Sequence, residues 1–282
     1  METILVTGAT GNVGREIVAH LNGTGVRVRA MTRQPESAGL PREVEVVQGD
    51  LTVPRTLAGC LEGVDAVFLV WTAPADAVGP ALEQIARHAR RIVFLSNMTV
   101  RDSADEQNYP VTALHLKIER LIAAAGVQWT FLRPGAFATN ARIWWAAQIR
   151  AGDVVRWPYA DAALSPIHER DIAAVAIRAL LEDTHAGAKY ILTGPQALTQ
   201  REQVRMIGDA IGRKLRFEEI PPETARLEML KIMPAQIVEM LLEAFAAATA
   251  SPAPVTSTVA QVTGAPAHSF RQWALDHAPE FR

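Results

Sequence analysis

Short apolar runs alternate with helix-like stretches along the first half of the chain. The runs occupy residues 3–8, 26–32, 44–48, 65–70, 91–96 and 128–133. This alternation predicts parallel strands joined by helices. The runs at 26–32 and 44–48 mix polar with apolar residues, whereas 66–70 and 92–95 are continuously apolar. The first pair is therefore expected toward one side of the sheet and the second pair in its buried middle, as in a Rossmann strand order of 3-2-1-4-5-6.

A glycine-rich segment directly follows the first apolar run. Residues 8–14 read Gly-Ala-Thr-Gly-Asn-Val-Gly, between the apolar residues 4–6 and the helix-like residues 15–21. A helix N-terminus in this position offers free N–H groups and its positive dipole end to a pyrophosphate, and glycine lets the backbone approach the ligand. The alternative is a purely structural tight turn. The predicted cofactor-binding residues of this segment are Gly8, Thr10, Gly11, Asn12, Val13 and Gly14.

This segment, TGATGNVG, resembles the atypical short-chain dehydrogenase/reductase superfamily, and specifically its NmrA-like branch of NAD(P)-binding proteins. Residues 129–137, 166–173 and 190–202 are similar to further segments of that branch. The implied fold class is α/β: a doubly wound parallel sheet (Rossmann fold) with a smaller, mostly helical C-terminal substrate domain. The expected dinucleotide-binding domain covers 1–135 with returning segments near 154–195. The substrate-binding region is expected within 136–282, largely 136–153 and 196–282.

The end of the second predicted strand bears on the choice of cofactor. NAD enzymes usually place Asp or Glu there to bind the ribose 2′-OH, whereas Met31-Thr32-Arg33 offers a hydroxyl and a guanidinium. Arg33 can pair with a 2′-phosphate, so NADPH is expected rather than NADH. The alternative is that Arg33 is a solvated residue at the start of a loop. No second basic residue follows before Arg42.

The family resemblance implies further cofactor contacts. Asp50 and Leu51 correspond to the turn that contacts adenine, although Asp50 can equally cap the following helix. Trp71 and Thr72 stand where the backbone passes the nicotinamide ribose and pyrophosphate. The residues expected to flank the nicotinamide are Pro134, Gly135 and Phe137.

Ser96, after the fifth predicted strand, matches the superfamily's serine that hydrogen-bonds a substrate carbonyl. The superfamily's tyrosine and lysine, four residues apart, are replaced: an alignment on Glu119 puts Val111 and His115 at their positions. His115 is a candidate proton donor or ribose contact. The alternative is a helix histidine paired with Glu119. The predicted catalytic residues are therefore Ser96 and His115.

Composition limits the partners. The 282 residues include 28 basic and 30 acidic side chains, so no net field favours nucleic acid or an acidic membrane surface. No apolar run reaches the length of a bilayer span. The single cysteine, Cys60, fits the cytoplasm and is expected to be a buried structural thiol. We expect no metal at the site, and a homodimer is possible.

Large apolar side chains gather in the second half of the chain. Trp144 and Trp145 are adjacent, and side chains one residue apart on a helix point about 100° apart, so one of them is expected to line a pocket. This favours a bulky, aromatic or polycyclic substrate. Thr199 and Glu202 form a capping box. Asp171 is expected to cap a helix or to tie domains together, and residues 250–266 look most like a loop.

Two functions remain open. The first is an NADPH-dependent oxidoreductase, such as a ketoreductase or quinone reductase, that transfers hydride to a carbonyl, a quinone or an activated double bond. The second is a non-catalytic NAD(P) sensor of the NmrA type, which the missing tyrosine and lysine favour. The fold alone does not decide between them.

Overall fold

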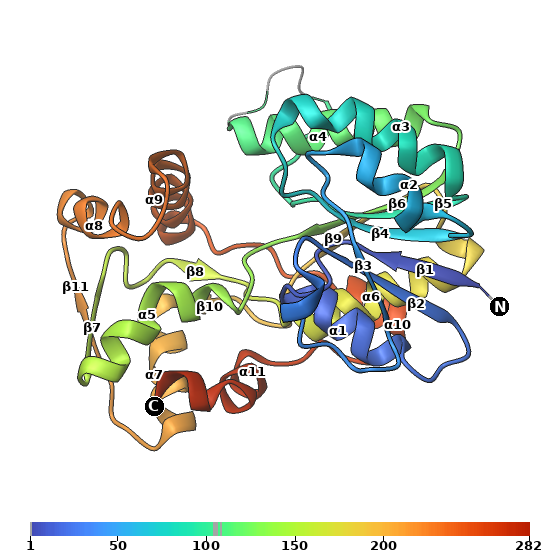
Figure 1. Ribbon diagram of the computed structural model, residues 1–282. Coiled ribbons are helices and arrows are strands. Elements are labelled where there is room, and N and C mark those ends of the chain that lie inside the picture. Colours follow the sequence, from blue (N-terminus) through green and yellow to red (C-terminus); the bar gives the residue numbers. More distant parts are fainter. Residues whose placement is uncertain (1, 104–106, 108) are drawn as a thin grey trace. The chain divides into compact units, whose positions relative to one another are not determined.

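The computed structural model describes residues 2–103, 107 and 109–282, and these divide into two compact units. Unit 1 comprises Met1–Pro134, Glu169–Leu192 and Gln261–Gly264, and unit 2 comprises Gly135–His168, Thr193–Ala260 and Ala265–Arg282. Figure 1 labels the helices and strands of both.

Unit 1 is built on a seven-stranded, all-parallel sheet in the order β3-β2-β1-β4-β5-β6-β9. The strands are β1 (Thr3–Val6), β2 (Arg27–Thr32), β3 (Glu45–Gln48), β4 (Ala66–Val70), β5 (Arg91–Leu95), β6 (Gln128–Pro134) and β9 (Ala188–Leu192). The order of the first six confirms the predicted Rossmann arrangement. The seventh strand, β9, was not among the runs that the apolar pattern marked as strands, because polar and apolar residues alternate at this sheet edge.

Helices cover both faces of this sheet. Helix α1 (Asn12–Leu21) packs against α6 (Glu169–Leu181) on one face, while α2 (Leu57–Leu61), α3 (Val78–His88) and α4 (Pro110–Ala124) pack in sequence on the other (Figure 1). The central strands β4 and β5 are buried along nearly their whole length, whereas β3 has exposed ends. The apolar pattern therefore located the buried middle of the sheet correctly.

Short 3-10 helices lie in several connections: η1 (Pro35–Ser37), η2 (Pro54–Thr56), η3 (Ala75–Ala77), η4 (Asp183–His185) and η5 (Ala278–Phe281). Helix α10 (Thr258–Thr263) lies within residues 250–266, so the expectation of a loop there is wrong for that part.

Unit 2 combines helices with two small sheets. Its helices are α5 (Asn140–Ala151), α7 (Gln200–Ile211), α8 (Pro222–Met229), α9 (Ala235–Ala250) and α11 (Phe270–Asp276). Strand β7 (Val154–Trp157) pairs in parallel with β11 (Arg216–Glu219), and β8 (Ala163–Leu164) pairs antiparallel with β10 (Leu198–Thr199). The predicted capping box at the start of α7 is confirmed, since Thr199 and Glu202 bond each other's backbone N–H groups.

The adjacent tryptophans of α5 both lie in the core of unit 2. Trp144 is 7% exposed and Trp145 is fully buried. Trp144 stacks against Trp157 and meets Phe245 edge-on, while its ring centre is 5.7 Å from that of Trp145. The expectation that one of them lines a pocket is wrong, because side chains from β7 and α9 enclose the helix over an arc wide enough to bury both rings.

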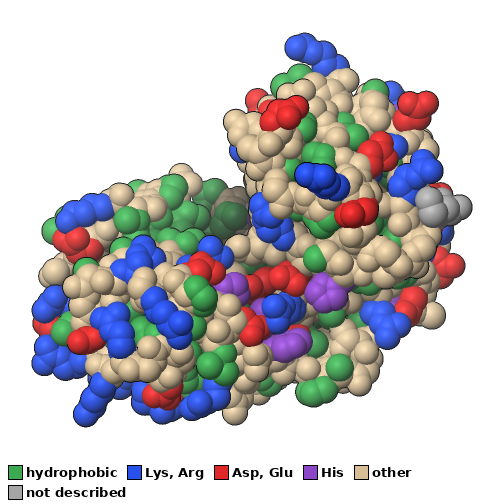
Figure 2. Space-filling view, turned by 60° about the horizontal axis from the view of Figure 1, so that its bottom comes forward, with side chains coloured by type: hydrophobic (Ala, Val, Ile, Leu, Met, Phe, Trp, Pro, Cys, Tyr) green, Lys and Arg blue, Asp and Glu red, His purple; other side chains and the backbone are tan. Residues whose placement is uncertain are grey.

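The described residues contain no helix long and apolar enough to cross a membrane. Basic and acidic side chains both appear over the face shown in Figure 2. Side chains of both signs on this face agree with a formal net charge of −2.

Candidate functional site: a cleft at the carboxyl edge of the parallel sheet

The glycine segment forms a tight turn between β1 and α1. Gly8 has a φ of +59°, a conformation that favours glycine. Gly11 is the N-cap residue of α1 and has no side chain to bond the first N–H groups of the helix. The Thr7 hydroxyl accepts from the N–H of Val70 at 2.7 Å, which fixes the turn against β4. The start of α1 is thus held in place with N–H groups available to an anion.

The second and third glycines of the motif, Gly11 and Gly14, have different neighbours. A Cβ on Gly14 would lie 2.2 Å from the carbonyl oxygen of Gly8, so only glycine lets α1 pack this close to the turn. A Cβ on Gly11 would meet only that same oxygen, at 3.2 Å, and Gly11 lines an open cleft. Gly14 is therefore required by packing, whereas Gly11 leaves room for a ligand.

These neighbours predict opposite outcomes for two substitutions. Gly11→Val should leave the melting temperature within a few degrees of wild type and weaken NADPH and NADH alike by tenfold or more, about 1.4 kcal/mol, because its side chain fills the cleft. Gly14→Ala should destabilise the fold by about 1–3 kcal/mol, because backbone atoms must move. Thermal denaturation and nucleotide titration of both variants check this. Unchanged nucleotide affinity in Gly11→Val would contradict the site assignment.

The cleft follows the carboxyl ends of four neighbouring strands of unit 1 and has a volume of about 260 Å³. Its lining residues come from the glycine turn and from the segments after β2, β3 and β4: Gly8, Thr10, Gly11, Met31, Thr32, Arg33, Gly49, Asp50, Leu51, Thr52, Val70, Thr72 and Ala73. Seven of the predicted cofactor-binding residues are among them: Gly8, Thr10, Gly11, Arg33, Asp50, Leu51 and Thr72. Ligands of doubly wound sheets bind at this edge, next to the point where the strand order reverses.

Asp50 and Arg33 face this cleft from adjacent strands. The Asp50 carboxylate accepts from both the N–H and the hydroxyl of Thr52 at 2.8 Å. These two bonds, with a smaller contribution from the Arg33 charge, hold the pKa of Asp50 below its ordinary value despite partial desolvation. Asp50 therefore caps the turn before η2 and stays ionised, while its role toward adenine remains a prediction.

Arg15 contacts the glycine turn and was not among the residues predicted from sequence. Its guanidinium donates to the carbonyl oxygens of Thr10, Ala38 and Gly39, each at 3.0 Å. It thereby ties the glycine turn to the loop that follows Arg33. Nothing in its sequence context distinguishes it from an exposed helix residue, because its acceptors are backbone carbonyls that lie together only after folding.

Other predicted cofactor residues lie outside the cleft lining. Asn12, Val13 and Gly14 form the first turn of α1. The buried Trp71 donates its indole N–H to the carbonyl of Ala73 at 2.6 Å, so only its backbone is available to a ligand. Pro134 ends β6 in unit 1. Gly135 and Phe137 belong to unit 2, where Phe137 forms a parallel bridge with Ile167.

Ser96 directly follows β5, at the same edge of the sheet as the cleft. Its N–H bonds the carbonyl of Leu132 at 2.7 Å. Its hydroxyl is buried and has no hydrogen-bond partner among the described residues. A buried hydroxyl left without a partner destabilises the fold by about 1–3 kcal/mol, so this group calls for an explanation such as a bound water, an ion or a catalytic role.

His115 lies on α4 with its ring stacked on Phe94 at 5.6 Å between centres. Its Nδ1 is 2.7 Å from the carbonyl oxygen of Val111, and because a carbonyl only accepts, Nδ1 carries the proton. Burial lowers the pKa of His115, more than the Val111 bond and the Glu119 charge raise it. The ring is therefore neutral near pH 7, and Nε2 presents a lone pair.

Glu119 is held by Arg133 rather than by His115. The guanidinium of Arg133, on β6, donates to both carboxylate oxygens of Glu119, at 3.0 and 2.5 Å, and to Asp102 at 2.7 and 3.1 Å. Lys189 also binds Asp102, at 2.7 Å. Hydrogen bonds from Arg133 and Lys189 hold the pKa of Asp102 well below its usual range. Glu119 and Arg133 thus form the buried end of an ionic network that links α4 to β6.

Cys60 and Asp171 have structural environments. The thiol of Cys60 is buried in α2, where desolvation raises its pKa, as expected for a structural cysteine. Asp171 is buried in the first turn of α6, where a negative charge is favourable to the helix dipole.

A doubly wound parallel sheet with a glycine turn and a cleft at its switch point defines the Rossmann-type α/β class of dinucleotide-binding folds. Within that class, the chain belongs to the NmrA-like family, whose model matches residues 1–263.

Two curated relatives match nearly the whole chain, and a solved structure shares its fold. The (4-alkanoyl-5-oxo-2,5-dihydrofuran-3-yl)methyl phosphate reductase of Streptomyces griseus subsp. griseus is 40% identical, over 99% of each chain. The NAD(P)H azoreductase of Xenophilus azovorans is 34% identical, over 99% of each chain. The Citrobacter sp. triphenylmethane reductase complexed with NADP(H) superposes with a TM-score of 0.79 at 19% identity, covering 98% of this chain and 99% of that one.

Proposed function

We propose that this protein is an NADPH-dependent reductase that transfers hydride to an activated acceptor. The observation that carries the proposal is the buried, unpartnered hydroxyl of Ser96, at the sheet edge that also holds the nucleotide cleft. The names of the two curated relatives, both reductases, support the same class of reaction.

The residues of the cleft fit a dinucleotide phosphate. The N-terminus of α1 receives the pyrophosphate, and the open space above Gly11 admits it. The segment after β2 lines the cleft with Met31, Thr32 and Arg33. It contains no carboxylate that would repel a 2′-phosphate, and the guanidinium of Arg33 can bind one. Bound NADPH supplies the hydride.

Arg33→Ala should weaken NADPH binding by about 1.5–3 kcal/mol, the range for a hydrogen bond to a charged group, and leave NADH binding unchanged. Arg42→Ala is the matched control, because Arg42 is also exposed but lies outside the cleft lining. Titration of both nucleotides against the three proteins checks this. An equal loss for NADPH and NADH would show that Arg33 does not bind the 2′-phosphate.

Ser96 donates its hydroxyl hydrogen to the acceptor oxygen of the substrate. The bond orients the acceptor and stabilises the negative charge that the hydride brings. His115 has a different role: a neutral ring whose Nε2 holds a lone pair accepts a hydrogen bond from a hydroxyl and does not act as an acid near pH 7. Of the two roles expected for His115, contact with a ribose or substrate hydroxyl fits this geometry.

The acceptor class is inferred from His115, whose lowered pKa makes it a poor acid near pH 7. The name of the 40% identical relative describes a dihydrofuranone whose ring double bond is conjugated to carbonyl groups. Hydride addition to such a double bond, or to a quinone, leaves a resonance-stabilised anion that takes its proton from water. We therefore place conjugated double bonds and quinones ahead of simple ketones as acceptors.

A nucleotide sensor is the second candidate, favoured by Val111 and His115 at the positions where the superfamily resemblance expects a tyrosine and a lysine. NADPH oxidation followed by absorbance, with separate panels of acylated butenolides, quinones and azo compounds, distinguishes the two functions. Steady turnover with one class supports the reductase. Tight NADPH binding without turnover in all three classes would favour the sensor.

A further inference from the structure

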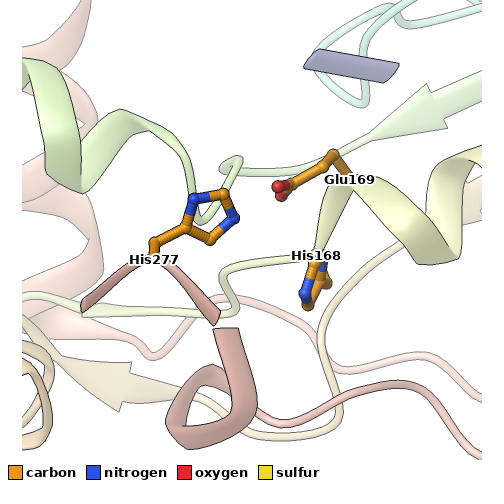
Figure 3. Close-up of side chains that lie close together, drawn as sticks. All are labelled: His168, Glu169 and His277. Carbon is orange, nitrogen blue, oxygen red and sulfur yellow. The ribbon is translucent and has the colours of Figure 1, made fainter. Parts of the chain in front are cut away.

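The hydride-transfer proposal leaves two groups of polar side chains without a role. The first group, His168, Glu169 and His277, draws on both units (Figure 3). The second group surrounds Arg15 and lies entirely within unit 1, so the contacts of one compact unit define its geometry. Arg15 directly follows the third glycine of the turn, near the start of α1.

The guanidinium of Arg15 joins two chain segments through their backbone carbonyls. Its Nε donates to Thr10 in the glycine turn, while Nη1 donates to Gly39 and Nη2 to Ala38, each at 3.0 Å. Ala38 and Gly39 end the loop that begins at Arg33, and Thr10 and Arg33 both line the nucleotide cleft. A planar guanidinium, with N–H donors on three nitrogens, is the side chain that can reach both segments at once.

The loop that Arg15 holds is short and internally bonded. It contains η1, and the N–H of Ala38 donates to the carbonyl of Pro35 across this turn at 3.1 Å. At the start of the loop, the carbonyl of Arg33 accepts from Gln48 Nε2 at 3.3 Å. Arg15 therefore fixes the far end of the segment that begins with Arg33, and removing its side chain leaves that end without these bonds.

The charge of Arg15 is not neutralised by a carboxylate. Its three acceptors are uncharged carbonyl oxygens, and no carboxylate of the described residues forms an ion pair with it. The next basic residue after Arg33 in sequence is Arg42, which does not line the cleft. The fold thus brings a second cation, from α1, to the loop that follows Arg33.

We propose that Arg15 is a positioning residue for the 2′-phosphate of NADPH: it holds the loop that keeps Arg33 at the cleft, and thereby sets the preference for NADPH over NADH. This inference rests on the NADPH preference stated in the proposed function. NADH has no phosphate for Arg33 to bind, so its affinity does not depend on the position of this loop. Because Arg15 is exposed, solvent screens its charge, and its main contribution is geometric.

Titration of NADPH and NADH against Arg15→Met and Arg15→Lys tests the proposal. Both variants lose the planar fork, so NADPH affinity should fall by about three- to tenfold, less than on deletion of Arg33, whose guanidinium remains. NADH affinity should stay within about twofold of wild type. Lysine keeps the charge, so full NADPH affinity in Arg15→Lys would contradict a geometric role.

Arg87→Met is the matched control. Arg87 is also an exposed helix arginine, but it pairs with the side chain of Glu83 on its own helix and does not line the cleft. Both nucleotide affinities should be unchanged in this variant.

Coupling to Arg33 distinguishes positioning from a general effect on the fold. In an Arg33→Ala background, Arg15→Met should change NADPH affinity by less than about twofold, because the group that it positions is absent. Hydrogen exchange of the nucleotide-free protein gives a second readout. Amides of residues 34–40 should exchange faster in Arg15→Met than in wild type, whereas those of β1 should not change.

The outcomes separate this inference from the proposed function. A preference for NADPH that is lost in Arg33→Ala but kept in both Arg15 variants would overturn the positioning role alone. Equal losses of NADPH and NADH, or additive losses in the double variant, would also overturn it and would mean that Arg15 stabilises the glycine turn as a whole. Equal binding of the two nucleotides by the wild-type protein would overturn both proposals. Binding and exchange do not depend on turnover, so inactivity toward every acceptor leaves the test valid.

Discussion

Arg133→Met should destabilise the protein by about 3–5 kcal/mol, the range for removing one partner of a buried ion pair. The side chain of Glu119 is 2% exposed, and its two carboxylate oxygens both accept from Arg133. Burial by itself lowers the pKa of Arg133, but the bonds and charges of Glu119 and Asp102 outweigh burial and raise it. Methionine would leave a carboxylate charge desolvated in unit 1. Chemical denaturation measures the loss.

The double variant Arg133→Met with Glu119→Leu tests the cause. It should recover a large part of the stability, because no uncompensated charge remains and apolar side chains can replace a buried pair. Arg226→Met is the control for an exposed pair, since Arg226 and Glu239 are each nearly half exposed, and it should cost less than about 1 kcal/mol. Additive losses in the double variant would show that Arg133 and Glu119 do not act as a pair.

Ser96→Ala should lower kcat by about 10²–10³, the usual effect of removing one donor to a developing oxyanion. NADPH affinity should stay within twofold of wild type, because Ser96 does not line the cleft to which we assign the nucleotide. Thr99→Val is the matched control: Thr99 lies three residues further along, and its hydroxyl is already bonded to Asn97 and Thr112. Steady-state kinetics and nucleotide titration check both variants.

His115→Gln should cost less than Ser96→Ala. A conjugated acceptor takes its proton from water, whereas misplacing its oxygen also misplaces the carbon that receives the hydride. Glutamine can replace the hydrogen bond of a neutral imidazole, so we expect a loss within about tenfold and no titration of kcat that depends on residue 115. A larger effect at His115, with loss of a pH-dependent step, would make it the principal catalytic residue.

The sheet of unit 1 could be predicted from sequence because each strand and the first turn are determined by residues that are neighbours in the chain. Continuous apolar runs at β4 and β5 reflect burial on both faces, and the glycine spacing fixes the turn into α1. Residues at strand ends can also be identified from sequence: Arg33 and Asp50 line one cleft, while their contacts with the cofactor stay a prediction. The NmrA-like resemblance, first noticed in that glycine turn, is confirmed by the family model.

Contacts between distant segments could not be predicted. The alignment on Glu119 identified an acidic residue in α4, but its partner, Arg133, is on a different element and is indistinguishable in sequence from an exposed strand residue. The prediction for Trp144 and Trp145 failed for the same reason. The angle between neighbouring side chains is a property of one helix, whereas the width of the core around that helix depends on β7 and α9, which come later in the chain.

The parallel pairing of β6 with β9 has a consequence during synthesis. Roughly 50 residues, including α5 and α6, lie between the end of β6 at Pro134 and the start of β9 at Ala188. At ribosomal rates of about 5–20 residues per second, the free edge of β6 waits roughly 3–10 seconds for its partner strand. An unpaired strand edge is a template for pairing with other chains, so the nascent protein carries an edge open to aggregation throughout that interval.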